Sequence, residues 1–186
     1  MSRHRARPAL RSAAIAAALC LLAGCAADRT ELKLQAAPPP RGKTVLVDAF
    51  VPAEPAWERL ARRLRSRLAD DLSQTGEVTL ITAQQASLPA QRPLVLSGEL
   101  VAADTGSEAV RFLVGMGLGN ASLRAHVRVV DSTSGQPVLE FDQTRTSRAG
   151  SGLGAHWNPT DMDNEIDALA AATAETVARW LNGQTL

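Results

Sequence analysis

Residues 120–131, with the sequence NASLRAHVRVVD, decide the fold because their side chains alternate between two faces. Strict alternation over this length predicts a half-buried β-strand. Residues 132–135 read as a turn, and residues 136–146 return as the hairpin partner. The apolar face of the first strand carries Leu123, Ala125, Val127 and Val129. The polar face carries Arg124, His126 and Arg128.

Three more segments towards the N-terminus read as strands. Residues 44–50 (TVLVDAF) form a short, apolar, β-branched run, and residues 77–82 form a second candidate. A polar loop follows to Pro93, and residues 94–103 (LVLSGELVAA) then form a third run, in which Gly98 suggests a bulge.

Two segments switch to helical spacing. Residues 54–73 carry an apolar stripe made of Trp57, Leu60, Ala61, Leu64, Leu68 and Leu72, and Gly76 follows as a stop. Residues 161–182 carry a second stripe made of Ile166, Leu169, Ala170, Thr173, Val177, Trp180 and Leu181. We therefore expect one α/β (α+β) domain over residues 43–186, with a mixed sheet of about five strands and two main helices.

The N-terminus has the form of an export signal. Residues 1–11 contain four arginines, and residues 12–22 form an apolar run that is too short to span a bilayer. Leu22-Ala23-Gly24-Cys25 closes the run and resembles the lipobox of bacterial lipoproteins, in which the cysteine is lipidated and becomes the first mature residue. The alternatives are an uncleaved interfacial helix and an ordinary secretory signal with a chance cysteine.

The lipobox resemblance divides the chain into a signal peptide (1–24), a lipidated tether (25–42) and a periplasmic domain (43–186). Pro38, Pro39 and Pro40 favour an extended spacer, so we expect the folded part to begin near Lys43. By resemblance to lipoprotein sorting patterns, the absence of Asp after the cysteine favours the outer membrane over the inner membrane.

Composition excludes several classes of function. Of the 20 Lys and Arg and the 19 acidic residues, residues 1–24 hold four basic and none of the acidic ones, which leaves 16 against 19. The mature chain is thus slightly acidic, which disfavours nucleic-acid binding. Removal of the signal peptide takes Cys20, and lipid would occupy Cys25, so no free thiol remains for a disulfide or a nucleophile.

Neither glycine-rich stretch predicts a catalytic or cofactor site. Residues 115–119 read G-x-G-x-G rather than the dinucleotide fingerprint, and no helix follows them. Ser151 and His156 lie close to Asp161 in sequence, but the strand–elbow–helix context of a serine hydrolase is missing. The histidines have no paired-ligand spacing. We therefore expect no catalytic residues, no cofactor and no metal.

The first helix offers a candidate partner surface. Arg59, Arg63 and Arg67 recur every four residues opposite the apolar stripe. They would either recognise an acidic partner or form a solvated face partly neutralised by nearby acids, and in both cases their substitution should barely affect stability. Trp157, in the second glycine-rich stretch, is the other candidate anchor.

Residues 94–140 resemble a family of bacterial lipoproteins known only as a domain of unknown function (number 4410). The matching positions are Gly98, Glu99, Arg111, Gly115, Gly117, Gly119, Asp131 and Gly135, with Ser134 where the family has Thr. The opening of the domain is also similar to the periplasmic domains of curli-secretion-channel and peptidoglycan-synthase-activator lipoproteins. The resemblance implies fold and location, and it implies no activity.

The sequence therefore predicts an outer-membrane-anchored envelope lipoprotein with a non-catalytic binding or accessory role. Its partners would be the membrane, through lipid on Cys25, and an envelope protein or cell-wall component. The alternative is a subunit of a secretion channel or transport assembly. A hydrolase is the third class, for which the sequence assembles no site.

Overall fold

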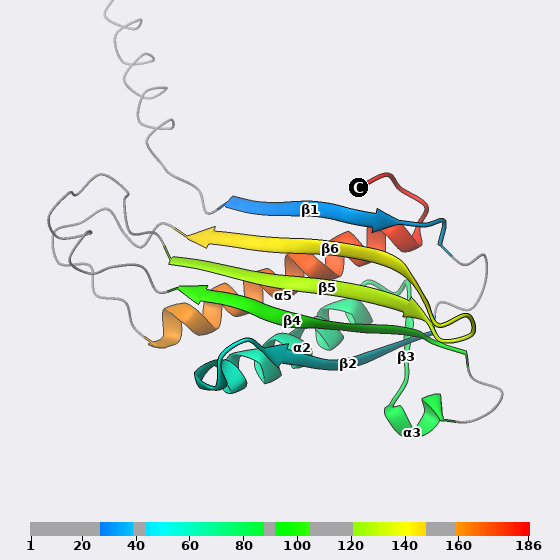
Figure 1. The fold of residues 1–186 in the computed structure, drawn as a ribbon, viewed down its shortest axis with the longest axis horizontal. Coiled ribbons are helices and arrows are strands. Elements are labelled where there is room, and N and C mark those ends of the chain that lie inside the picture. The colour runs from blue at the N-terminus through cyan, green and yellow to red at the C-terminus, as the bar shows by residue number, and fades with distance from the viewer. Residues whose placement is uncertain (1–26, 39–43, 88–91, 105–120, 148–158) are drawn as a thin grey trace, which may run out of the picture.

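The structure is a computed structural model that describes residues 27–38, 44–87, 92–104, 121–147 and 159–186. A six-stranded mixed sheet in the order β1-β6-β5-β4-β2-β3 is covered on one face by two long helices (Figure 1). The strands are β1 (Ala27–Gln35), β2 (Thr44–Pro52), β3 (Thr79–Leu80), β4 (Leu94–Asp104), β5 (Ala121–Asp131) and β6 (Gln136–Ser147). The helices are η1 (Pro55–Trp57), α2 (Glu58–Gln74), α3 (Ala83–Ala86) and α5 (Pro159–Leu181). The predicted α+β class and single domain are confirmed.

The predicted hairpin forms as β5 and β6, and the structure places it inside the sheet. Both β6 and β4 pair with β5 in antiparallel fashion, with Val127 opposite Phe141 on one side and opposite Gly98 on the other. The four apolar side chains that define the inner face of β5 are at most 1% exposed. Full burial contributes roughly 1.5–3 kcal/mol for each of Leu123, Val127 and Val129.

The helices bury the stripes that their spacing predicted. On α2 the buried residues are Leu60, Ala61, Leu64, Leu68 and Leu72, and Trp57 in η1 is half-buried. On α5 they include Ile166, Leu169, Ala170, Thr173, Val177, Trp180 and Leu181. Gly76 and Gly183 follow the two helices with φ of 68° and 71°, a left-handed conformation that ends a helix readily. The sheet therefore has one face under helices, and no described helix covers the other face, which we call the open face (Figure 1).

The prediction of a tether over residues 25–42 is wrong for residues 27–35. These residues form β1, an edge strand that pairs antiparallel with β6 from Ala27 opposite Thr146 to Gln35 opposite Leu139. The sequence signal was weak because only Leu32 and Leu34 are large and apolar, and an edge strand needs little burial. The domain therefore begins at or before Ala27, and the sheet has six strands rather than about five.

The end of β1 is fastened to the rest of the domain. The Ala36 N–H donates to the Val138 carbonyl at 2.8 Å, and the indole N–H of the fully buried Trp180 donates to the Ala36 carbonyl at 2.7 Å. At the other end, the Arg145 guanidinium contacts Asp28 at 2.9 Å and Glu165 at 2.8 Å. These contacts hold β1 against both β6 and α5.

The strand expected at residues 77–82 is reduced to Thr79–Leu80. The polar segment after it, expected to be a loop, contains the short helix α3. Thr82 caps this helix, because its hydroxyl accepts from the Gln85 N–H at 3.3 Å while the Gln85 side chain accepts from the Thr82 N–H at 2.9 Å. This capping box competes with continuation of the strand.

Gly98 is not itself the bulge that the sequence suggested. The irregularity lies on β2, which runs from Val47 to Phe50 while β4 runs only from Leu96 to Gly98. Gly98 instead permits close approach, since a Cβ atom there would lie 2.2 Å from the His126 carbonyl oxygen and 2.7 Å from the Phe50 ring.

Candidate interaction surfaces

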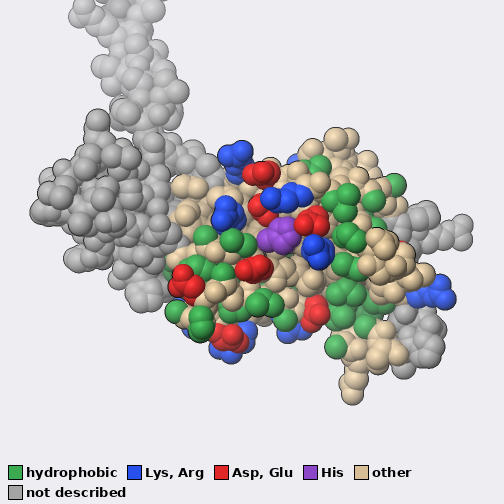
Figure 2. Space-filling view, viewed as in Figure 1, with side chains coloured by type: hydrophobic (Ala, Val, Ile, Leu, Met, Phe, Trp, Pro, Cys, Tyr) green, Lys and Arg blue, Asp and Glu red, His purple; other side chains and the backbone are tan. Residues whose placement is uncertain are grey.

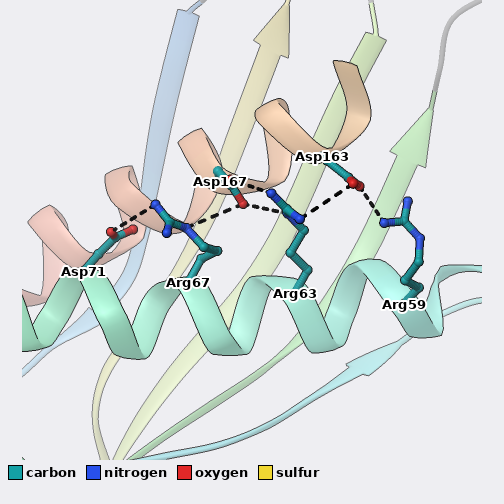
Figure 3. A network of polar contacts seen from close by, with 6 residues as sticks. All are labelled: Arg59, Arg63, Arg67, Asp71, Asp163 and Asp167. Atoms are coloured by element: carbon teal, nitrogen blue, oxygen red, sulfur yellow. Dashed lines mark hydrogen bonds and ion pairs between the residues drawn. The ribbon is translucent and has the colours of Figure 1, made fainter. Parts of the chain in front are cut away.

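The arginines of α2 interdigitate with acids of α5 (Figure 3). Arg59 contacts Asp163 at 2.6 Å, and Arg63 grips Asp167 with two hydrogen bonds of 2.8 and 2.7 Å. A longer contact of 3.6 Å joins Arg67 to Asp167. We call these residues, with Asp71, the interhelix ladder. Because early residues of α2 meet early residues of α5, the two helices run parallel.

The ladder arises from matched spacing on the two helices. Arginines recur every four residues on α2, and Asp163 and Asp167 are also four apart on α5, so each set forms a stripe along its helix. The hydrogen bond to Asp167 raises the pKa of Arg63. The fork of the guanidinium matches the carboxylate, which makes this contact the strongest of the ladder.

Neither sequence-based reading of these arginines, as a surface for an acidic partner or as a solvated face, included their pairing with acids of α5. The Arg59, Arg63 and Arg67 side chains remain 58%, 37% and 42% exposed, but their charges face Asp163 and Asp167. An acidic partner at this surface would have to compete with those two carboxylates. Their first role is to join α2 to α5, and their substitution is expected to affect stability.

Reversing the charge at Arg63 tests this role. Arg63→Glu removes the bidentate pair and places a third carboxylate beside Asp163 and Asp167. After allowance for solvent screening we expect a loss of about 1–2 kcal/mol, or roughly 3–6 °C in Tm. Thermal unfolding, monitored by circular dichroism, measures the change in Tm.

Arg62 supplies the matched control. It is 70% exposed and, among the described residues, its ion pair is with Glu58 of its own helix, at 3.1 Å, so Arg62→Glu should leave Tm nearly unchanged. Combining Arg63→Glu with Asp167→Arg should recover part of the loss. Equal effects of Arg62→Glu and Arg63→Glu would contradict the structural role of the ladder.

A shallow groove of about 330 Å³ lies next to Asp71, at the end of the ladder, between the C-terminal halves of α2 and α5. Its lining includes Asp71, Gln74, Ala174, Ala178 and Arg179. Partial burial raises the pKa of Asp71, and one of its carboxylate oxygens has no hydrogen-bond partner in the part of the chain that the structure describes. Small alanine side chains leave the groove shallow, so it provides little enclosure for a ligand.

The open face of the sheet carries a second polar cluster, centred on His126 (Figure 2). Its two ring nitrogens lie 2.7 Å from Asp142 and 3.2 Å from Glu140. Lys33 also contacts Asp142, at 3.1 Å, and Arg128 approaches Glu140 at 3.5 Å. Partial burial would raise the pKa of Asp142, but hydrogen bonds from His126 and Lys33 outweigh it and lower the pKa. Two acids and two cations therefore surround His126 on this face.

Asp131 and Gly135, which belong to the family-like motif, have a structural role. Asp131 accepts from the Thr133 N–H at 2.8 Å and from the Ser134 hydroxyl at 3.2 Å, and the backbone bond lowers its pKa. Gly135 adopts φ of 70° at the end of the turn. Ser134 supplies the same hydroxyl as the Thr of the motif. These residues shape the β5–β6 turn.

Several predicted residues lie outside the part of the chain that the structure describes. They are Cys25, Arg111, Gly115, Gly117, Gly119, Ser151, His156 and Trp157. Within the described ranges, no group of three or more His, Cys, Asp or Glu side chains is arranged to hold a metal ion. The sequence did not predict the His126 cluster or the ladder, because each joins residues that are distant in sequence.

Comparison with solved structures shows where this fold occurs. PelC, solved as a dodecamer from Paraburkholderia phytofirmans, aligns with a TM-score of 0.55 and 18% identity over 86% of this chain and 100% of that one. The hypothetical protein CT253 from Chlamydia trachomatis gives 0.52 and 14% over 77% and 100%. Protein XCC0632 from Xanthomonas campestris gives 0.51 and 10% over 80% and 91%. At these identities the likeness concerns the fold.

Sequence comparison assigns the family. No curated protein matches the chain. The family described as "Domain of unknown function (DUF4410)" matches residues 48–151, more than half of the chain, from within β2 to just beyond β6. The chain therefore belongs to the DUF4410 family.

Proposed function

We propose that the protein is an envelope lipoprotein, anchored to the outer membrane by lipid on Cys25, with a non-catalytic binding or accessory role. The observation that carries the proposal is the Leu22–Cys25 lipobox placed directly before a folded domain. None of the described helices is long and apolar enough to cross a membrane. Lipid on the cysteine would supply the attachment.

A binding role is supported by the chemistry of the two charged clusters. Each carboxylate of the ladder contacts an arginine, and in the His126 cluster Lys33 contacts Asp142 while Arg128 approaches Glu140, so these groups hold the fold or mark a surface. The partner would be another envelope protein or a cell-wall component. The open face of the sheet is the surface that we propose for it, since the other face lies under α2 and α5.

Substitution of the anchor tests the proposal. Cys25→Ser should abolish incorporation of labelled fatty acid, leave the precursor uncleaved and remove the mature chain from the outer-membrane fraction. Stable anchoring requires more than one acyl group on the protein, because a single acyl group gives only marginal membrane binding. Normal processing of Cys25→Ser, with unchanged outer-membrane fractionation, would refute the lipoprotein assignment.

Crosslinking in cells tests the binding surface. A photoreactive residue at Arg128, on the open face, should capture a partner, and the same residue at Arg62, on α2, is the control. Capture of a partner at position 62 but not at position 128 would indicate that the binding surface lies on the helices and not on the open face.

The alternative role, a subunit of a secretion or transport assembly, rests on the edge strand β1. Its Leu32 and Leu34 are 40% and 37% exposed, and exposed apolar side chains on an edge strand are typical of association sites. PelC, which shares the fold, was solved as a dodecamer. Light scattering after size exclusion separates a monomeric binder from an assembly subunit.

A further inference from the structure

The start of β1 limits how far the domain can lie from a lipid on Cys25. Ala27 is fixed in the sheet opposite Thr146, and only two Cα–Cα steps separate it from Cys25. Whatever their conformation, two steps span at most about 7 Å. A tether that reached to Lys43 would have let the domain reorient relative to the membrane. The short connection from Cys25 to Ala27 restricts that reorientation.

The start of β1 lies at the same end of the sheet as the end of β6, the start of β5 and the end of β4, on the left in Figure 1. β1 begins beside the last residues of β6, Ala121 of β5 lies opposite Ser147 of β6, and Asp104 of β4 lies opposite Ser122. A lipid on Cys25 would bring this end, and not the β5–β6 turn at the opposite end, to the bilayer.

A basic row crosses the open face two residues inside this end. Arg29 lies opposite Thr144, which lies opposite Arg124, and residues directly opposite in neighbouring strands share a face. Both arginines are exposed, and neither pairs with an acid among the described residues. The next row inward contains Glu31, Asp142 and His126. Among the described residues, the two cations that have no acidic partner are thus on the side nearest the anchor.

We propose that this end of the sheet rests on the membrane surface, with Arg29 and Arg124 facing the phosphates of lipid headgroups. The inference rests on the proposed lipidation of Cys25. It commits the domain to one orientation, with the strands rising from the bilayer and the β5–β6 turn farthest from it.

Two matched labelling sites on β5 test the orientation. Ser122 lies at the proposed membrane end and Ser132 directly follows the other end, about 34 Å away at about 3.4 Å per residue. The mature lipidated chain would have no free thiol of its own. Ser122→Cys and Ser132→Cys therefore each provide a single site for a fluorophore. The proteins are reconstituted in vesicles of phosphatidylethanolamine and phosphatidylglycerol that contain a quencher-bearing lipid.

Quenching should be several times stronger at position 122 than at position 132. Equal quenching in protein that mass spectrometry shows to be lipidated would overturn the orientation and leave the lipoprotein assignment standing. Absence of lipid on Cys25 would overturn both. Inserting about 20 Gly and Ser residues before Ala27, with an expected span of about 25 Å, should shrink the difference. An unchanged difference would refute the short connection as its cause.

The extended chain also tests the arginines. Quenching that remains at position 122 should rise with phosphatidylglycerol content and fall in the Arg29→Gln, Arg124→Gln double variant. Arg62→Gln, on α2, should leave it unchanged. Contact between these arginines and headgroups would be refuted if quenching at position 122 of the extended chain changed neither with lipid charge nor in the double variant.

Discussion

Gly98→Ala is expected to destabilise the domain by about 3 kcal/mol or more, although it adds a single methyl group. The new Cβ would lie 2.2 Å from the carbonyl oxygen of His126 and 2.7 Å from the ring of Phe50. Phe50 is 5% exposed and packed in the core, and the carbonyl belongs to the backbone of β5. Neither can move without opening the contact between β4 and β5 or between β4 and β2.

Gly135 provides a control for the general cost of replacing glycine. A Cβ at Gly135 meets nothing within 4 Å, but φ of 70° places the residue in the left-handed region. Gly135→Ala should therefore cost only about 1 kcal/mol. Chemical denaturation of both variants gives the two free energies of unfolding. A Gly98→Ala loss no larger than that of Gly135→Ala would show that the close approach is easily relieved.

The parts of the fold that were predictable from sequence are those that bury a periodic apolar face. The alternation in β5 and the helical stripes of α2 and α5 each place large side chains on one side, and burial then follows from the hydrophobic effect. β1 was missed for the opposite reason. It lies at an edge, has only two large apolar residues, and is held mainly by backbone pairing with β6, which leaves little trace in sequence.

The charged contacts were hidden by separation along the chain. Arg63 and Asp167 are joined although their positions differ by 104 residues. The spacing held a usable signal, because basic residues at four-residue intervals on one helix match Asp163 and Asp167 at the same interval on the other. Pairing the stripes, however, required knowing that α2 and α5 are parallel neighbours. The His126 cluster likewise depended on the register of β1, β6 and β5.

Trp180→Ala is expected to have the second large effect, a loss of about 3–5 kcal/mol, the usual cost of removing a buried tryptophan. Trp180 is fully buried near the end of α5, and its indole N–H donates to Ala36, directly after β1. The substitution therefore leaves a cavity and also frees the end of the edge strand. Denaturation measures the stability, and amide exchange should show the largest loss of protection in β1.

Two variants separate the packing of Trp180 from its hydrogen bond. Trp180→Phe keeps much of the apolar volume but removes the N–H donor, so it should cost about 1–3 kcal/mol and still expose β1 to exchange. Trp57→Ala removes a tryptophan that is only half-buried and should be milder than Trp180→Ala. If Trp180→Phe leaves the exchange of β1 unchanged, the indole bond does not hold the strand. Its position would then follow from pairing with β6 and from the Arg145 contacts with Asp28 and Glu165, which lie at the end that we propose faces the membrane.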